Sequence, residues 1–175
     1  PTIQDGWIHA LTIPREVSIQ NGKYLQKPAR ELWNLTTDVQ KIQWNATRFE
    51  SVFSSPAQVW TVNWKEDVQD KLAIQLRNEI SIQYDAESQV LSVSRTDWET
   101  GEKETRERTL QSPLQHLNAW MDYSSLELFV NEGEEVFTLR FFTEEDSLDF
   151  LIQQTIEQEM AIEVYSVKES GFIVE

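Results

Sequence analysis

Hydrophobic and polar residues alternate with a period of two over much of the chain, most clearly from residue 59 onward. Trp60, Val62 and Trp64 fall on one side of such a segment, whereas Thr61 and Asn63 fall on the other. Alternation of this kind is typical of antiparallel strands that turn one face to a core and the other to water. Strands at intervals of about 8 to 12 residues predict an all-β sandwich or barrel. The further segments that we expect to be strands are 72–76, 80–84, 91–93, 117–122, 126–130 and 136–142.

Turn residues punctuate the first part of the chain. Asn21-Gly22 separates two short extended segments, 17–20 and 23–26. This pair predicts a tight hairpin, because both positions of such a turn need positive φ. Residues 29–35, which follow a proline, are expected to form a helical turn or a linker.

Two later segments are also interpreted as turns. Residues 97–107 are polar and charged, and they predict an exposed loop or a ragged hairpin. Residues 131–134 link two of the expected strands. Gly133 suits the left-handed backbone conformation that this linking turn needs.

Composition narrows the class of protein. The chain has 175 residues, enough for one domain or for one domain and a fragment of another. Its net charge of −15 disfavours binding to nucleic acid or to an anionic membrane surface. It has no Cys and only two His, His9 and His116, so we expect no disulfide, no thiolate chemistry, no metal centre and no cofactor. No apolar segment approaches the roughly 20 residues that span a bilayer.

Two dense motifs flank the middle of the chain. The first is Gly-Trp-Ile-His-Ala-Leu-Thr-Ile-Pro-Arg-Glu at 6–16, followed by Gly-Lys-Tyr-Leu-Gln-Lys-Pro at 22–28. The second is Asp-Tyr-Ser-Ser-Leu-Glu-Leu-Phe-Val-Asn-Glu-Gly-Glu at 122–134. In this order they resemble the carboxy-terminal part of glycoside hydrolase family 32, the sucrose-6-phosphate hydrolases and invertases. The resemblance is specific over 5–32 and 117–142 and weaker between them.

The resemblance implies a division of the chain. Residues 1–32 would be a remnant of the last blade of a five-bladed β-propeller with a linker, and 33–175 would be the β-sandwich domain. Enzymes of this family carry a nucleophilic Asp in an Asn-Asp-Pro-Asn-like motif, an Arg-Asp-Pro and a Glu-Cys. This chain contains no Asp-Pro and no Cys, so no residue here inherits a catalytic role.

The resemblance also implies a set of signature residues in the sandwich. Asp122 and Glu127 could be a general acid and a nucleophile, since glycoside hydrolysis uses two carboxylates. We instead expect a structural role, with either residue hydrogen-bonding to backbone or pairing with Arg140, because positions five apart in a strand face opposite sides. The full signature, interpreted as structural, is Asp122, Ser124, Glu127, Phe129, Asn131, Gly133 and Arg140.

Residues 147–160 carry two competing patterns. Their apolar residues fit a helical period, with Asp146 or Ser147 as a possible cap. The family resemblance instead implies short closing strands, ending in an alternating segment at 162–167. We interpret the segment as strands.

Seven Trp residues raise the question of sugar binding. Trp60 and Trp64 would lie on one face of a strand, about 13 Å apart, roughly as a sugar platform requires. We expect them to fill the core instead, because Trp brings a large apolar area. Trp98, in a charged segment, is the better candidate for an exposed aromatic that contacts sugar.

The resemblance implies the non-catalytic sandwich domain of a cytoplasmic β-fructofuranosidase that acts on sucrose or sucrose-6-phosphate. Its partners would be its own propeller domain and, where the enzyme forms a homo-oligomer, another copy. A carbohydrate-binding module and a stand-alone interaction domain are the alternatives.

Overall fold

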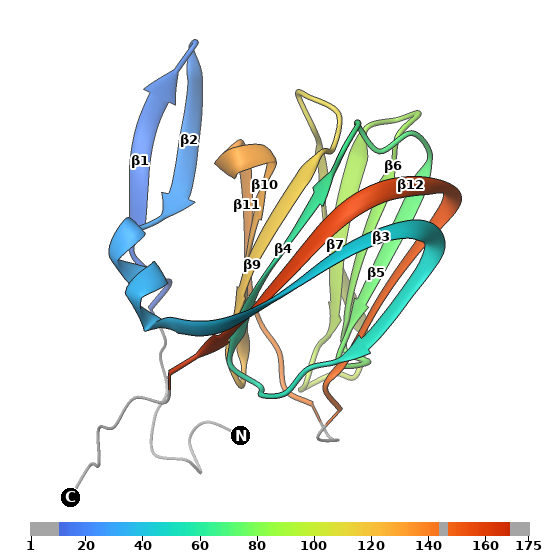
Figure 1. The fold of residues 1–175 in the computed structure, drawn as a ribbon. Coiled ribbons are helices and arrows are strands. Elements are labelled where there is room, and N and C mark those ends of the chain that lie inside the picture. The colour runs from blue at the N-terminus through green and yellow to red at the C-terminus, as the bar shows by residue number, and fades with distance from the viewer. Residues whose placement is uncertain (1–10, 144–146, 169–175) are drawn as a thin grey trace, which may run out of the picture.

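The structure, a computed structural model, describes residues 11–143 and 147–168 (Figure 1). Residues 6–10 of the first motif lie outside the described residues, as does Asp146. The elements are β1 (Arg15–Gln20), β2 (Lys23–Pro28), the 3₁₀ helix η1 (Arg30–Leu35), β3 (Thr36–Val52), β4 (Gln58–Trp64), β5 (Lys71–Leu76), β6 (Ile80–Asp85), β7 (Val90–Thr96), β8 (Lys103–Thr109), β9 (His116–Met121), β10 (Ser125–Val130), the 3₁₀ helix η2 (Asn131–Gly133), β11 (Glu135–Arg140) and β12 (Asp149–Val167).

The two longest strands, β3 and β12, hold the sandwich together. They pair with each other along most of their length, with a register shift between Gln153 and Gln158. On its other edge, β12 pairs with β5 through residues 150–154 and with β4 through residues 160–166. One bent strand therefore belongs to two layers, β12-β5-β6-β7-β8 and β12-β4-β9-β10-β11, which face each other (Figure 1). Every strand pairing in the described part is antiparallel, so the all-β sandwich prediction is confirmed.

Residues 149–167 form one strand, which confirms the interpretation of this segment as β structure. The expectation of several short strands was wrong, because a single strand crosses from one layer to the other. The helix-like spacing of apolar residues in this segment coincides with the place where the strand crosses between layers and its register shifts. Ile156, one member of the helical set, is 40% exposed where the register shifts, whereas Phe150 and Ile152 on the regular part are buried. A bulge that bends a strand interrupts its period of two.

Two edge strands, β3 and β8, do not show the alternation of apolar and polar residues that marks the other strands. β3 carries a single buried residue, Phe49, because it pairs on one side only and much of its surface meets water. β8 is exposed at every position and completes a hairpin with β7, the second of the two forms expected for 97–107. Its sequence, Lys-Glu-Thr-Arg-Glu-Arg-Thr, is of the charged kind that protects an open sheet edge from pairing with other chains.

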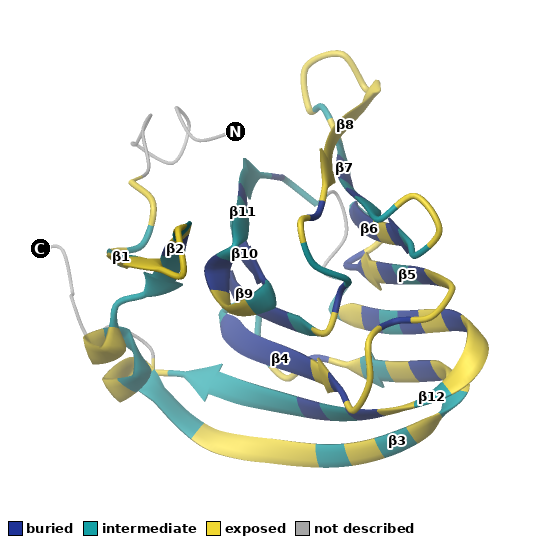
Figure 2. Cartoon of the chain, turned by 90° about the horizontal axis from the view of Figure 1, so that it is seen from above, coloured by how far each residue is buried: buried dark blue, intermediate teal, exposed yellow. Residues whose placement is uncertain are grey.

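The main core lies between the two layers, and in Figure 2 the buried residues gather on the central strands while β3 and β8 are largely exposed. Phe150 is its aromatic centre, with ring centroids 5.0 Å from Phe53 and 5.2 Å from Trp60. Trp60 and Trp64 are buried, so the expectation that they fill the core is confirmed. The Trp64 indole N–H donates to Gln154 Oε1 at 2.8 Å, which satisfies its one polar atom.

Replacement of Phe150 by Ala should lower the free energy of unfolding by about 3–5 kcal/mol, because it empties the centre of the core. Ile156→Ala on the same strand is the control and should cost about 0.5 kcal/mol, because the side chain is 40% exposed. Chemical denaturation measures both. Equal losses in the two variants would contradict the assigned core.

Candidate functional site

The outer face of the β4-β9-β10-β11 layer is covered by the N-terminal hairpin and η1 rather than open to water. Here we call this surface the covered face; its residues are Val59, Thr61, His116, Asn118, Trp120, Glu127, Phe129, Val136 and Thr138. A second apolar cluster forms on it from Val59, Trp120 and Phe129, against which Trp33 of η1 packs. Figure 2 shows the hairpin standing beside β10 and β11.

Glu127 links the covered face to the chain that precedes the hairpin. Its Oε1 accepts the Ile13 backbone N–H at 2.7 Å, and its Oε2 accepts the Arg15 guanidinium at 2.5 Å and 3.2 Å. Arg15 also donates to Thr138 Oγ1 at 2.7 Å, and its guanidinium lies 5.5 Å from the centre of the Phe129 ring. The Glu127 side chain is only 5% exposed, so this charge is held by directed partners and not by water.

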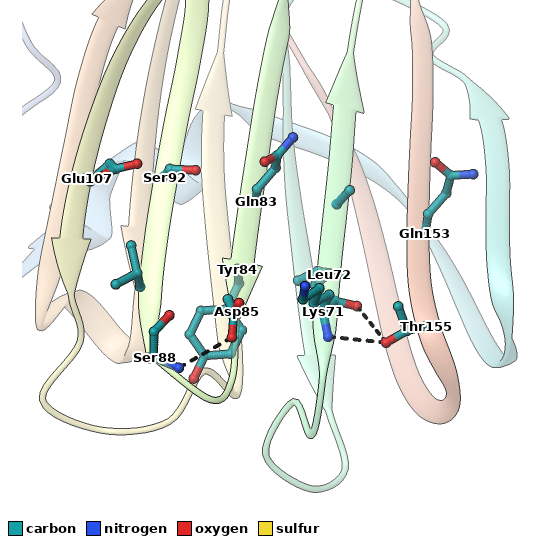
Figure 3. Close-up of a pocket in the computed structure, with 12 residues that line it drawn as sticks. Lys71, Leu72, Gln83, Tyr84, Asp85, Ser88, Ser92, Glu107, Gln153 and Thr155 are labelled. Carbon is teal, nitrogen blue, oxygen red and sulfur yellow. Dashed lines mark hydrogen bonds between the residues drawn. The ribbon is translucent and has the colours of Figure 1, made fainter.

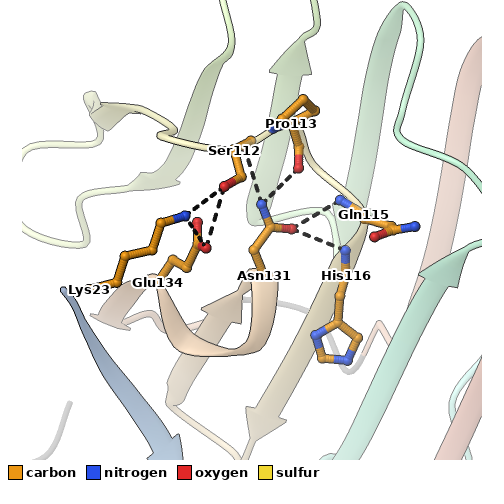
Figure 4. Close-up of polar contacts among 7 residues, drawn as sticks. All are labelled: Lys23, Ser112, Pro113, Gln115, His116, Asn131 and Glu134. Atoms are coloured by element: carbon orange, nitrogen blue, oxygen red, sulfur yellow. Dashed lines mark hydrogen bonds and ion pairs between the residues drawn. The ribbon is translucent and has the colours of Figure 1, made fainter. Parts of the chain in front are cut away.

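Asn131 fastens the loop before β9 to the turn after β10 (Figure 4). Its Oδ1 accepts the backbone N–H groups of Gln115 and His116 at 3.0 Å and 3.2 Å. Its Nδ2 donates to the carbonyls of Ser112 and Pro113 at 3.2 Å and 2.8 Å. All four hydrogen-bonding positions of the side-chain amide are used.

Gly133 brings the hairpin close to this turn. Its φ is +92°, and a Cβ at this position would lie 1.9 Å from the backbone oxygen of Gln26 in β2. Lys23 of the same strand forms an ion pair with Glu134 at 2.6 Å and donates to Ser112 Oγ at 2.8 Å (Figure 4). The left-handed backbone expected at Gly133 is confirmed, and the contact with β2 adds a second reason for glycine.

Asp122 works within its own turn. Its Oδ1 accepts the backbone N–H groups of Ser124 and Ser125 at 2.8 Å and 2.9 Å, in the arrangement of an Asx turn that opens β10. Asp122 is exposed whereas Glu127 is buried, so the two carboxylates have different surroundings. Both hydrogen-bond to backbone, one of the alternatives drawn from the sequence, and the arginine paired with Glu127 is Arg15 instead of Arg140.

Arg140 and Trp98 belong to a separate cluster at the other end of the signature. The Arg140 guanidinium lies 5.7 Å from the Trp98 ring centre and 5.2 Å from that of Phe142. Arg95 of β7 has its guanidinium 4.5 Å from the centre of the Trp98 ring. Trp98 is 37% exposed, and its ring is in contact with these cations and with Phe142. Its surroundings are those of a cation–π cluster.

His116 is a second titratable group beside the hairpin, and its side chain is 18% exposed. Burial lowers its pKa below the ordinary value, Glu132 with Oε1 at 3.7 Å from Nδ1 opposes this in part, and Lys27 adds to the lowering. The ion pair between Lys27 and Glu132, at 2.6 Å, lowers the pKa of the Glu132 carboxyl in turn. His116 is therefore neutral in the folded protein near neutral pH.

Three clefts deserve comparison. One of about 610 Å³ and one of about 330 Å³ flank the hairpin on the covered face, and both include His116 and Glu132. A third, of about 570 Å³, lies on the opposite layer, where Gln83, Ser92 and Glu107 line the outer face of β6, β7 and β8 (Figure 3). Among residues 11–143 and 147–168, no group of three or more His, Cys, Asp or Glu side chains is placed to hold a metal ion. In the same residues, no helix is long and apolar enough to cross a membrane.

Replacement of Gly133 by Ala should push β2 off the covered face, because the added methyl group would overlap the Gln26 carbonyl. We expect the free energy of unfolding to fall by more than about 2 kcal/mol, and amide exchange at Leu25 to accelerate. Gly101→Ala is the matched control: φ there is +70°, but a Cβ would meet nothing within 4 Å, so only the backbone cost of about 1 kcal/mol applies. Equal losses for the two variants would contradict the close approach.

The burial of His116 should make stability fall as the pH drops below about 7. The folded pKa is lowered, so the contribution of neutral His116 is present above the unfolded value of about 6.5 and is lost as the pH falls through and below it. His116→Gln should flatten this part of the profile of urea-unfolding midpoint against pH. Parallel profiles for the parent chain and the variant would contradict the assignment.

The chain matches a known protein family and several named proteins in sequence. The model of the family described as glycosyl hydrolases family 32 C terminal matches residues 25–168. A protein of Vibrio cholerae serotype O1 named "Probable sucrose-6-phosphate hydrolase" is 34% identical over 148 residues, which cover 84% of this chain and 27% of that protein. The sucrose-6-phosphate hydrolase of Staphylococcus xylosus is 31% identical over 159 residues, with coverage of 84% and 32%.

A solved structure of the same family resembles this chain in fold. The family 32 β-fructofuranosidase of Bombyx mori superposes with a TM-score of 0.70 at 25% identity, over 95% of this chain and 34% of that one. The chain thus spans about a third or less of the length of the proteins that it matches. Because the family match covers most of the chain, the chain belongs to the C-terminal domain family of glycoside hydrolase family 32.

Proposed function

We propose that this chain is the non-catalytic C-terminal part of a β-fructofuranosidase that acts on sucrose or sucrose-6-phosphate in the cytoplasm. The names of the relatives support the substrate class. The proposal assigns 1–32 to the end of a propeller and 33–175 to the sandwich. The role of the sandwich domain is to bind the propeller and to fix the position of the propeller. The same domain also contributes a contact between copies in a homo-oligomer.

The main support for this proposal is that residues of the family signature contact the N-terminal hairpin. Glu127 binds the segment leading into β1, and Gly133 allows β2 to approach. Asn131 hydrogen-bonds to the loop before β9, and Lys23 donates a hydrogen bond to Ser112 in the same loop. These residues support attachment of the preceding chain, and the two oxygens of the Glu127 carboxylate are engaged in it rather than presented to a substrate.

The hairpin itself supports the presence of a larger neighbouring sheet. Within the described residues, β1 and β2 pair only with each other. Ile19 and Tyr24 lie opposite each other and are 76% and 55% exposed, and Val17, two positions along β1, is 55% exposed. A two-stranded ribbon with an apolar exposed face is marginal by itself, so further strands of a propeller blade are the partner that we propose for it.

The test compares this chain with the longer protein encoded by the same gene. We expect the 175-residue chain to release no fructose from sucrose or sucrose-6-phosphate, and the longer protein to release it. Release by the chain alone, or an upstream sequence without the Asn-Asp-Pro-Asn-like, Arg-Asp-Pro and Glu-Cys motifs, would overturn the proposal.

A variant of the longer protein separates a structural role of Glu127 from a catalytic one. Glu127→Gln leaves Arg15 with a weakened partner in a largely buried site, so the thermal midpoint should fall by several degrees. The kcat of the protein that stays folded should be unchanged. A loss of kcat by a factor of about 1,000 or more would mark a catalytic carboxylate and contradict the structural role.

A further inference from the structure

The strand β8 leaves one edge of the sandwich open. It ends the layer β12-β5-β6-β7-β8, and among the described residues it pairs with β7 alone. The strands β3 and β11 also lie at sheet edges, but each contains a buried position, whereas β8 is exposed at every position. Figure 2 shows β8 exposed at the end of its layer. The unpaired backbone of such a strand is a template for another strand.

The hydrogen bonds at the two ends of the β7–β8 ladder show which backbone groups of β8 face outward. Asp97 donates its backbone N–H to the Glu102 carbonyl at 2.8 Å, and Leu110 donates its N–H to the Gln89 carbonyl at 2.9 Å. Hydrogen-bonded pairs alternate with non-bonded pairs along an antiparallel ladder, so the even-numbered residues of β8 bond to β7. The backbone N–H and C=O groups of the odd-numbered residues within 103–109 therefore point to the open edge.

The charges of residues 102–108 mirror one another with opposite sign about Thr105. The segment reads Glu-Lys-Glu-Thr-Arg-Glu-Arg. The mirrored pairs are Glu104 with Arg106, Lys103 with Glu107, and Glu102 with Arg108. The segment has no net charge, although the whole chain carries −15. Copies of this acidic chain repel one another, and β8 is a place on the surface that adds nothing to that repulsion.

We propose that β8 is a contact between two copies of this chain, which pair antiparallel about a two-fold axis through Thr105. In this register the outward-facing backbone groups of 103, 105 and 107 form about six hydrogen bonds with the second copy. Each mirrored pair brings opposite charges together, because residues directly opposite each other lie on the same face of a sheet. The inference rests on the proposed function only for the homo-oligomer contact, to which it assigns a strand.

Other symmetric registers bring like charges together. An axis through Arg106 places this guanidinium opposite its own copy, and an axis through Glu104 does the same with the carboxylate. An axis through Lys103 or Glu107 also pairs each residue with itself. Thr105 is thus the one position within 103–107 at which the axis creates no like-charge pair. Charges that protect this edge from an arbitrary strand are complementary to the same strand of a second copy.

Most of the charged groups that the contact uses have no competing ion pair. Within residues 11–143 and 147–168, Lys103, Arg106 and Glu107 form none. Glu104 and Arg108 have partners on β7 and β11, at 2.7 Å and 3.9 Å. The contact between Lys103 and Glu107 is therefore the cleanest one to test, because its loss disturbs no other ion pair of the described chain.

The experiment is sedimentation equilibrium of the 175-residue chain and of two charge-reversal variants at low ionic strength. We expect the parent chain to dimerise weakly, with Kd in the micromolar to millimolar range, because a strand edge buries little area. Lys103→Glu and Glu107→Lys should each raise Kd by about tenfold or more, since each places two like-charge pairs across the axis. Glu107→Lys should do so although it lowers the net charge of the chain.

An equimolar mixture of the two variants is the decisive sample. Every contact between positions 103 and 107 is again complementary in the mixed dimer, so its Kd should return to within about threefold of the parent value. Glu87→Lys is the matched control: it makes the same charge change in the exposed turn between β6 and β7 and should leave Kd within about twofold. Thermal midpoints check that all variants are folded.

Amide exchange locates the contact. In a single copy the Thr105 N–H points to the open edge, whereas the Arg106 N–H bonds to β7. Raising the protein concentration through Kd should therefore slow exchange at Thr105 and leave exchange at Arg106 unchanged.

Three results would overturn the proposal. The first is a parent chain that stays monomeric at millimolar concentration. The second is a dimer whose Kd neither variant changes, which would place the contact elsewhere, such as on the exposed face of the N-terminal hairpin. The third is a mixture of variants that dimerises no better than either alone. None of these results bears on fructose release, so a failure here is distinguishable from a failure of the proposed enzymatic role.

Discussion

The buried carboxylate of Glu127 is the contact on which the attachment of the N-terminal hairpin depends. A carboxylate removed from water needs directed donors, and here they come from chain more than a hundred residues earlier, the Ile13 amide and the Arg15 guanidinium. These donors fix where the hairpin begins. Its tip region is then positioned by the Lys23–Glu134 pair and by the close approach of Gly133 to Gln26. The buried Glu127 carboxylate, the Lys23–Glu134 ion pair and the absence of a side chain at Gly133 together determine the orientation of the hairpin.

The same surface explains why the signature motif is dense. Five of its members make four kinds of local contact: Asp122 closes a turn, Glu127 and Phe129 face the hairpin, Asn131 hydrogen-bonds to the loop before β9, and Gly133 leaves space for β2. β10 supplies Glu127 and Phe129 from its outer positions while Leu126 and Leu128 fill the main core from its inner ones. One strand thus serves both the sandwich and the attachment of the preceding chain.

Local sequence determined a large part of this architecture. Alternation of large apolar and polar residues in segments such as 59–64 and 80–84 predicted half-buried antiparallel strands, and Asn21-Gly22 predicted the hairpin, whose turn has φ of 51° and 77°. Such patterns depend on neighbours one or two positions away. Strands that bury little, β3 and β8, left no such pattern, because their identity comes from backbone pairing and not from side-chain burial.

Tertiary structure alone decided the contacts that cross the chain. The sequence placed Glu127 in a signature but could not choose Arg15 over Arg140 as its partner, because that choice depends on where the hairpin packs. It equally could not show that β12 bends through both layers, since the bend follows from pairing with β4 and β5 on either side of a bulge. The pairing of Thr61 with Asn118 beneath Trp33 likewise joins three segments distant in sequence. Periodicity records which face of a strand is buried, whereas the partner that buries it is set by the packing of the whole domain.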